Sequence, residues 1–315
     1  MAVNRTTIVR GPCVIDMGSQ KFLTKGDVIL EVSKKAFPID TAVWGKLEDR
    51  LEDSEVKVRF TPVGEWLSAM LTILYPYMNP SIGSSIFGAA DVPVYIWGQD
   101  GQKVTLAAAA VTKMPSLNLS ARKTIFGECE LTCVPANATT RITANSIFTI
   151  AAGTFPSLST FDRTKIRTSK FGVVWGASPF DSIITEDGIT IDFNVSVEPV
   201  KIDDEGTIDM TLSGVEVTAK LVPIGKSLVN ILDALNIQGT NGAIGGSFFT
   251  QANDLVITGA ASGDPLVTIK KAALQDNFQA TWGSGKKRLN DLVFKTQRGV
   301  TAGVPDALFS LALVT

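Results

Sequence analysis

The sequence predicts a mainly β protein made of two tandem copies of one domain, each a β-sandwich or barrel with one helix. Three observations predict this fold class: a long internal repeat, alternating apolar residues in both halves, and one helical stripe in each half. The clearest repeated segments are 56–67 and 217–228, in which Pro62 corresponds to Pro223 and Gly64 to Gly225. Because the distance between the copies is too long for a solenoid unit and suits a whole domain, we expect a duplication.

The repeat extends well beyond these segments. We call the offset between Pro62 and Pro223 the main offset. At this offset eleven positions between residues 24 and 74 are identical in the two copies. About three identities are expected by chance in a window of this length. Thr7 and Gly11 match Thr168 and Gly172 at the main offset, and further on the match drifts by one or two positions, so that Lys123 matches Lys286. We therefore expect a first domain at 1–153, a linker at 154–167 and a second domain at 168–315.

The repeated unit predicts a strand, a turn and a helix. Val56, Val58 and Phe60 alternate with polar residues, and Pro62 cannot donate a ladder hydrogen bond, so we expect the strand to end there. Gly64 permits a sharp turn into the helix. The helical stripe, with apolar residues at i, i+3, i+4 and i+7, consists of Leu67, Met70, Leu71 and Leu74 and, in the second half, of Leu228, Ile231, Leu232 and Leu235.

Short apolar or alternating runs, bounded by turn residues, predict the other strands. In the first half they are 5–15, 27–33, 92–97, 104–111, 128–134 and 146–151. In the second half they are 189–197, 255–258, 266–273, 291–295 and 307–314. Each half therefore has one helix between early and late strands.

Charged segments recur in both halves and are the candidate contacts between subunits. The acidic residues are Glu48, Asp49, Glu52, Asp53, Asp203, Asp204 and Glu205; the basic residues are Arg122, Lys123, Lys286, Lys287 and Arg288. Solvated loops are the ordinary interpretation of such runs. The alternative is that acidic loops bind basic loops of a neighbouring subunit, which we favour over an acidic lining of a central channel. The segment 283–288 is not a phosphate loop, because Ala280 occupies the position of a required glycine.

Composition excludes several classes of site. The chain has 315 residues, 45% hydrophobic, 19% charged, with net charge −2 and no histidine. Without histidine there are no Ser-His or Cys-His dyads, and most zinc sites are excluded. Cys13, Cys129 and Cys133 lack metal-site spacing, and we expect Cys129 and Cys133 to be a reduced, buried pair on one strand face. We expect no enzyme activity, no cofactor, no metal, no signal peptide and no membrane binding.

Each half has strands, then one helix, then further strands, arranged around 56–74 in the first half and 217–235 in the second. This repeated order resembles that of the tail-tube proteins of long-tailed bacteriophages. Members of that superfamily have a β-sandwich or barrel flanked by one helix. They form sixfold or pseudo-sixfold rings that stack into a hollow tube, and some carry two fused copies and form trimeric rings.

The resemblance implies a major tail tube subunit, assembled in the host cytoplasm into the virion tail, whose channel delivers the genome. It implies homotrimers, with hexamers as the alternative, and partners among terminator, baseplate and tape-measure proteins, with DNA passing through the channel. The first alternative is a baseplate hub or distal tail ring protein. The second, from another class, is a carboxylate-based enzyme acting on glycosides.

Overall fold

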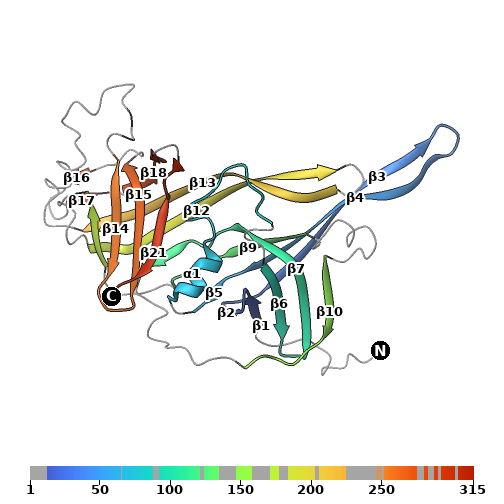
Figure 1. The fold of residues 1–315 in the computed structure, drawn as a ribbon, viewed down its shortest axis with the longest axis horizontal. Helices are drawn as coiled ribbons and strands as arrows, with labels where there is room; N and C mark the ends of the chain where they lie inside the picture. The colour runs from blue at the N-terminus through green and yellow to red at the C-terminus, as the bar shows by residue number, and fades with distance from the viewer. Residues whose placement is uncertain are drawn as a thin grey trace.

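The protein is mainly β, as expected, with two large antiparallel sheets and the helix α1 (Ser68–Leu74). The computed structural model describes residues 13–64, 66–87, 92–120, 124–134, 147–157, 171–176, 184–202, 206–224, 247, 249, 252–274, 280–282, 287–289, 292–301 and 304–315. Figure 1 shows the two sheets side by side, with α1 between them; the second contains β8 of the first half in addition to strands of the second half.

The first sheet follows the order β3-β4-β9-β7-β6-β1-β2-β5, with β10 paired to β7. Its strands are β1 (Cys13–Met17), β2 (Gln20–Thr24), β3 (Ile29–Thr41), β4 (Gly45–Phe60), β5 (Pro62–Val63), β6 (Val92–Gly98), β7 (Gln102–Lys113), β9 (Cys129–Val134) and β10 (Phe148–Ala152). The strand β5, last in this order, directly follows β4, which is second in the order. The sheet therefore curves back toward β4, as in a barrel.

The second sheet follows the order β11-β14-β15-β18-β13-β12-β8, with β21 paired to β15. Its strands are β8 (Leu117–Leu119), β11 (Phe171–Trp175), β12 (Ile184–Ile202), β13 (Gly206–Ile224), β14 (Asn253–Gly259), β15 (Pro265–Leu274), β18 (Leu292–Thr296) and β21 (Phe309–Leu313). Two small ladders join β16 (Ala280–Trp282) to β17 (Lys287–Leu289) and β19 (Val300–Thr301) to β20 (Val304–Pro305).

The pairing scheme of the first sheet recurs in the second. All thirteen residue pairs between β3 and β4, from Ile29↔Arg59 to Thr41↔Gly45, reappear between β12 and β13 at the main offset, from Thr190↔Lys220 to Ile202↔Gly206. Both register shifts within this hairpin recur as well. Gly45 and Gly206 close the two hairpins with φ of 70° and 68°, a conformation that glycine adopts without strain.

The later strands repeat with the expected drift. Val94↔Leu106 between β6 and β7 corresponds to Leu255↔Ile269 between β14 and β15, the first residue at the main offset and the second two positions beyond it. The match of Gly11 with Gly172 differs from the observed register. Val14 of β1 pairs with Trp97 of β6, and Gly172 of β11 pairs with Thr258 of β14. Because Trp97 and Thr258 are equivalent at the main offset, Val14 and not Gly11 corresponds to Gly172, a displacement of three positions. Gly11 itself lies outside the described residues.

The acidic segment around Glu48 to Asp53 is strand, and our expectation of a solvated loop is wrong for it. It forms most of the outer part of β4, paired residue by residue with β3. The alternation that marks a strand is missing from its sequence because this hairpin is exposed on both faces. Figure 1 shows the blue β3–β4 hairpin projecting past the end of the yellow β12–β13 hairpin.

The first predicted helix is present as α1, and Met70, Leu71 and Leu74 of its stripe are buried. Leu67 precedes the helix as its N-cap and is 45% exposed, so the buried stripe is one residue shorter than expected. The strand before it ends at Phe60, ahead of Pro62, as expected. In the second half β13 continues through Pro223 to Ile224, and the predicted helix at 228–235 lies outside the described residues.

Candidate self-association surface

The two halves of the chain are joined by different surfaces, not by the same surface twice. The strand β8 belongs to the first half by sequence but pairs with β12 of the second sheet, with Asn118 opposite Thr190. It covers the outer edge of β12, which would otherwise end the sheet. The contact is therefore heterologous: the first half supplies a strand and the second half supplies an edge.

A loop of the first half covers a second part of the second sheet. Gly83 N donates to Leu212 O at 2.8 Å, and Leu212 N donates to Ser84 O at 2.9 Å. Ile86 N donates to Met210 O at 2.9 Å, so residues 83–86 follow β13 for several residues. Leu212, whose backbone bonds to this loop, is only 2% exposed.

The region around α1 makes the third contact between the halves. Trp66 Nε1 donates to Ala312 O of β21 at 2.6 Å, and its ring stacks on Phe126 with centroids 6.0 Å apart. Tyr75, which ends the helix, packs edge-on against Phe193 of β12 at 5.0 Å. We expected the helix to pack across a sheet of its own domain; it also contacts β21 of the second sheet.

A groove of about 830 Å³ runs along this junction. Its charged lining comes from both halves: Lys113, Glu128, Asp192, Glu216, Lys220 and Lys295. Each of the three carboxylates lies near a lysine Nζ of the same half, at 2.9, 3.7 and 3.4 Å for Glu128, Asp192 and Glu216. These pairs balance charge inside the groove, as suits a contact between protein surfaces.

The positions on β3 and β4 that correspond to buried residues of β12 and β13 are exposed. Phe193 of β12 is 3% exposed, whereas Val32, at the same place on β3, is 42% exposed. Leu212 is 2% exposed and Leu51, at the same place on β4, is 50% exposed. Ile150 of β10 is 60% exposed. Together, β3, the outer part of β4, and β10 form what we call the acceptor face of the first half.

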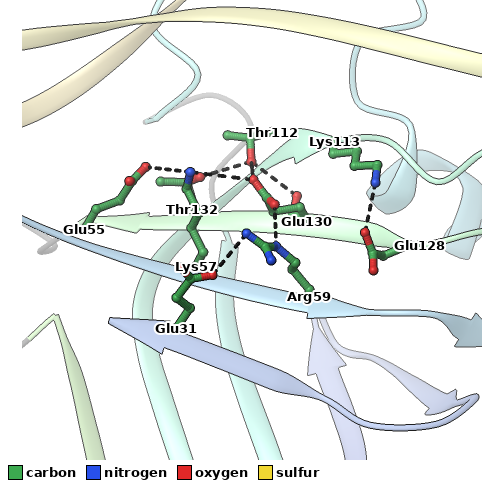
Figure 2. A network of polar contacts seen from close by, with 9 residues as sticks. All are labelled: Glu31, Glu55, Lys57, Arg59, Thr112, Lys113, Glu128, Glu130 and Thr132. Atoms are coloured by element: carbon green, nitrogen blue, oxygen red, sulfur yellow. Dashed lines mark hydrogen bonds and ion pairs between the residues drawn. The ribbon is translucent and has the colours of Figure 1, made fainter. Parts of the chain in front are cut away.

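A network of ion pairs joins β3, the inner part of β4 and β9 (Figure 2), on the face of the sheet opposite to Val32. Arg59 Nε donates to Glu130 at 2.8 Å and Arg59 Nη2 lies 3.0 Å from Glu31. Hydrogen bonding to Glu130, followed by the charges of Glu130 and Glu31, raises the pKa of Arg59. Lys57 lies 3.4 Å from Glu55 and 3.9 Å from Glu130.

This network corresponds in register to the polar wall of the groove. Glu31 and Arg59 stand where the second half has Asp192 and Lys220, each at the main offset. The first-half pair is 3.0 Å apart and the second-half pair 3.7 Å apart. The first half therefore has an ion pair at the positions of the Asp192–Lys220 pair of the groove wall, and the side chains of that second-half pair are exposed.

The acidic contacts predicted at Glu48, Asp49 and Glu52 of β4 have partners within the chain. Glu48 lies 2.7 Å from Arg50, Asp49 2.7 Å from Lys46, and Glu52 2.7 Å from Lys35. These three pairs are exposed, so they remain available to exchange partners with another subunit.

Asp53 is different from the other acidic residues. It lies at the junction of the two hairpins, where its carboxylate accepts from Thr207 Oγ1 at 2.8 Å and lies 3.2 Å from Lys201 Nζ. Its side chain is 14% exposed, so the structure gives it a contact within the chain.

The other predicted contacts are described only in part. Lys287 and Arg288 lie on β17, where the backbone alone is described. The remaining predicted contacts lie outside the described residues: Arg122, Lys123, Asp203, Asp204, Glu205 and Lys286.

The cysteines agree with the sequence-based expectation. Cys129 and Cys133 both lie on β9, both are buried, and neither is in a disulfide. Burial raises the pKa of the Cys133 thiol to about 12 and raises that of Cys129 further. Among the described residues no cluster of three or more Cys, Asp or Glu is placed to bind a metal ion.

Comparison with known proteins adds no relative. No protein-family model matches the chain, and no curated protein is similar to it in sequence. Within the described part of the chain, no helix has the length and apolar character needed to cross a membrane.

Sequence reasoning found the charged segments but missed the acceptor face. Leu51 and Leu212 are one of the identical pairs of the repeat, yet one is half exposed and the other is buried. What local sequence patterns do not record is that the first half covers the second through β8 and the 83–86 loop.

Proposed function

We propose that the two halves are copies of one tube domain and that the protein is the major tail tube subunit of a long-tailed bacteriophage. In this role three chains close a ring of six domains, and the rings stack into a channel for the genome. The proposal takes its identity from the resemblance in the order of strands and helix, which spans nearly the whole chain.

One observation carries the structural part of this proposal. The two halves share a pairing scheme but meet through different surfaces, an acceptor on β12 and a donor at β8. Heterologous contacts of this kind generate rings when the rotation closes and filaments when it does not, whereas contacts between identical surfaces stop at a dimer. A chain that contains one such contact and presents the acceptor for another is suited to build a ring.

The projecting β3–β4 hairpin supports self-assembly as well. Its turn carries Val43 and Trp44, which are 80% and 77% exposed, and Phe37 and Leu47 along its sides are 43% and 54% exposed. Large exposed apolar residues gathered on one projecting element are typical of a protein interaction site. We expect this hairpin, which projects past the end of the β12–β13 hairpin in Figure 1, to contact a neighbouring subunit of the assembly.

Mass photometry and negative-stain electron microscopy of the purified chain over a salt series test the proposal. We expect trimers that form rings and stack into tubes, with stacking weakened by salt to the extent that charged contacts hold the rings together. A chain that stays monomeric at every concentration, without rings or tubes, contradicts the tail-tube function. Rings of six chains contradict only the trimer.

A further inference from the structure

We propose that the acceptor face of the first half binds the second half of another copy of the chain, with β16 of that copy pairing along β3. The interface repeats, between chains, the contact that the two halves make within one chain. This inference deepens the proposed function and rests on it for the biological setting, but its geometry comes from the pairing within the chain.

The donor element is present in both halves. In the first half β8 is followed by a return segment, with Leu117 bridged to Phe126. In the second half β16 is followed by β17, with Ala280 paired to Leu289. Ala280 lies two positions beyond the main offset from Leu117, and Leu289 lies two positions beyond it from Phe126. The strands β15 and β18 are displaced from β7 and β9 by the same two positions. The β16–β17 hairpin is therefore the second-half equivalent of the strand that covers β12.

The acceptor edge is present in both halves and is covered in only one. In the second sheet β8 lies outside β12, whereas in the first sheet, as far as the chain is described, β3 is the end of the strand order. Ile29, at the start of β3, is 49% exposed, and Thr190 at the same place on β12 pairs with Asn118. An uncovered strand edge presents unpaired backbone groups, and adding a strand to such an edge is a common mode of recognition.

The occupant must come from a second chain. Figure 1 places β16 and β17 at the opposite end of the molecule from the β3–β4 hairpin. The second half is also held in place by β8 and by the loop at 83–86 on its own acceptor positions. Within one chain, β16 therefore cannot reach the edge that it matches.

The pairing within the chain sets the register between chains. Thr190 opposite Asn118 and Ile191 opposite Leu117 translate into Ile29 opposite Thr281 and Leu30 opposite Ala280 of the neighbouring copy. Leu51 lies on the acceptor face at the position of Leu212. The contact between chains lacks one feature of the contact within the chain, because Ser227 stands at the position of Trp66 in the repeat. Without that indole the contact between chains is the weaker of the two, as suits reversible assembly.

Cysteine cross-linking tests the register directly. In a Cys13→Ser background, the double variant Ile29→Cys/Thr281→Cys is oxidised and run on a non-reducing gel, and we expect covalent dimers and trimers. A mixture of the two single variants gives covalent dimers and nothing larger, which shows that the bond joins different chains. The matched control is Ile29→Cys/Ala280→Cys, which loses the product because adjacent residues of a strand point to opposite faces.

The outcomes separate this inference from the function on which it rests. Rings or tubes in the microscope without cross-linking of the aligned variant overturn the inference and leave the function standing. Cross-linking in the aligned register with open filaments and no closed rings supports the inference and contradicts the tail tube. A monomer that never cross-links contradicts both.

Discussion

Leu51 and Leu212 occupy the same place in two hairpins of identical register, yet Leu212 is 2% exposed and Leu51 is 50% exposed. Leu51 lies opposite Ala36 and Leu212 opposite Val197, each directly after a register shift that the two hairpins share. The residue type and the local backbone are the same. One difference is the loop at 83–86, whose backbone bonds to that of Leu212 along the edge of β13 and has no counterpart beside Leu51 among the described residues.

We predict that Leu51→Asp leaves the fold intact and weakens self-association. Because Leu51 is half exposed, a charge there remains solvated, and the free energy of unfolding of the isolated chain changes by about 0.5 kcal/mol or less. In the assembled protein the same carboxylate is buried against the neighbour without a partner. Chemical denaturation reports the first quantity, and mass photometry over a concentration series reports the second.

The matched variant is Leu212→Asp, in which the charge is placed under the loop of the same chain. Here the cost appears in folding itself, at about 3 kcal/mol or more, because the carboxylate is buried without a partner. Should Leu51→Asp assemble as well as the unmodified chain, the acceptor face is not an interface between chains. Val300→Asp serves as a control for surface charge, since Val300 is 66% exposed and lies outside the acceptor face.

The helix α1 gives a prediction about stability. Leu71 is 2% exposed in the core, and Leu71→Ala removes most of its side chain there. We expect a loss of about 2–5 kcal/mol from the free energy of unfolding. Leu67→Ala, on the same predicted stripe but 45% exposed, costs about 0.5 kcal/mol or less. Equal costs for the two variants, measured by urea denaturation, contradict the position of α1.

These elements show how far the fold could be predicted from the sequence. The repeat predicted a common architecture for the two halves because identical positions such as Pro62 and Pro223 lie near strand ends, where few residue types are tolerated. Alternation predicted the strands that bury one face, but it missed the outer part of β4, where Glu48 and Asp49 are exposed on a strand with no buried face. The acceptor face was not predictable because exposure there depends on contacts between halves, which local periodicity does not record.

The second sheet gives a prediction for acid. Partial burial acts to raise the pKa of the Asp254 carboxyl, but hydrogen bonds from Lys270 Nζ and Lys271 N and the charges of both lysines outweigh it, so its pKa lies below the usual 3.8. A carboxyl whose pKa is lowered by folding stabilises the folded state above its usual pKa, and this contribution is lost as pH falls through the lowered value. Asp254→Asn should therefore reduce stability near neutral pH and narrow its gap to the unmodified chain below pH 3.8.

Urea denaturation at several pH values measures this gap. A gap of constant size from neutral pH to below pH 3.8 indicates that the loss comes from packing around residue 254 and not from its charge. Asp264→Asn is a suitable comparison, since Asp264 lies in the turn that precedes β15 and accepts from the backbone amide of Ala261 at 2.9 Å.

The last prediction concerns the cooperation of the two halves. Trp66 of the first half donates to Ala312 O of the second at 2.6 Å, is 3% exposed and stacks on Phe126. Trp66→Phe retains an aromatic ring but leaves the Ala312 carbonyl without this donor, at a cost of about 1–3 kcal/mol. Because this hydrogen bond joins the two halves, the lost free energy should weaken the interaction between them, so that they unfold less cooperatively. Calorimetry should show one transition for the unmodified chain and a broadened or divided transition for the variant. A variant that keeps one sharp transition at a lower temperature assigns Trp66 to the stability of the common core, and the halves are then coupled chiefly by β8 and the loop at 83–86.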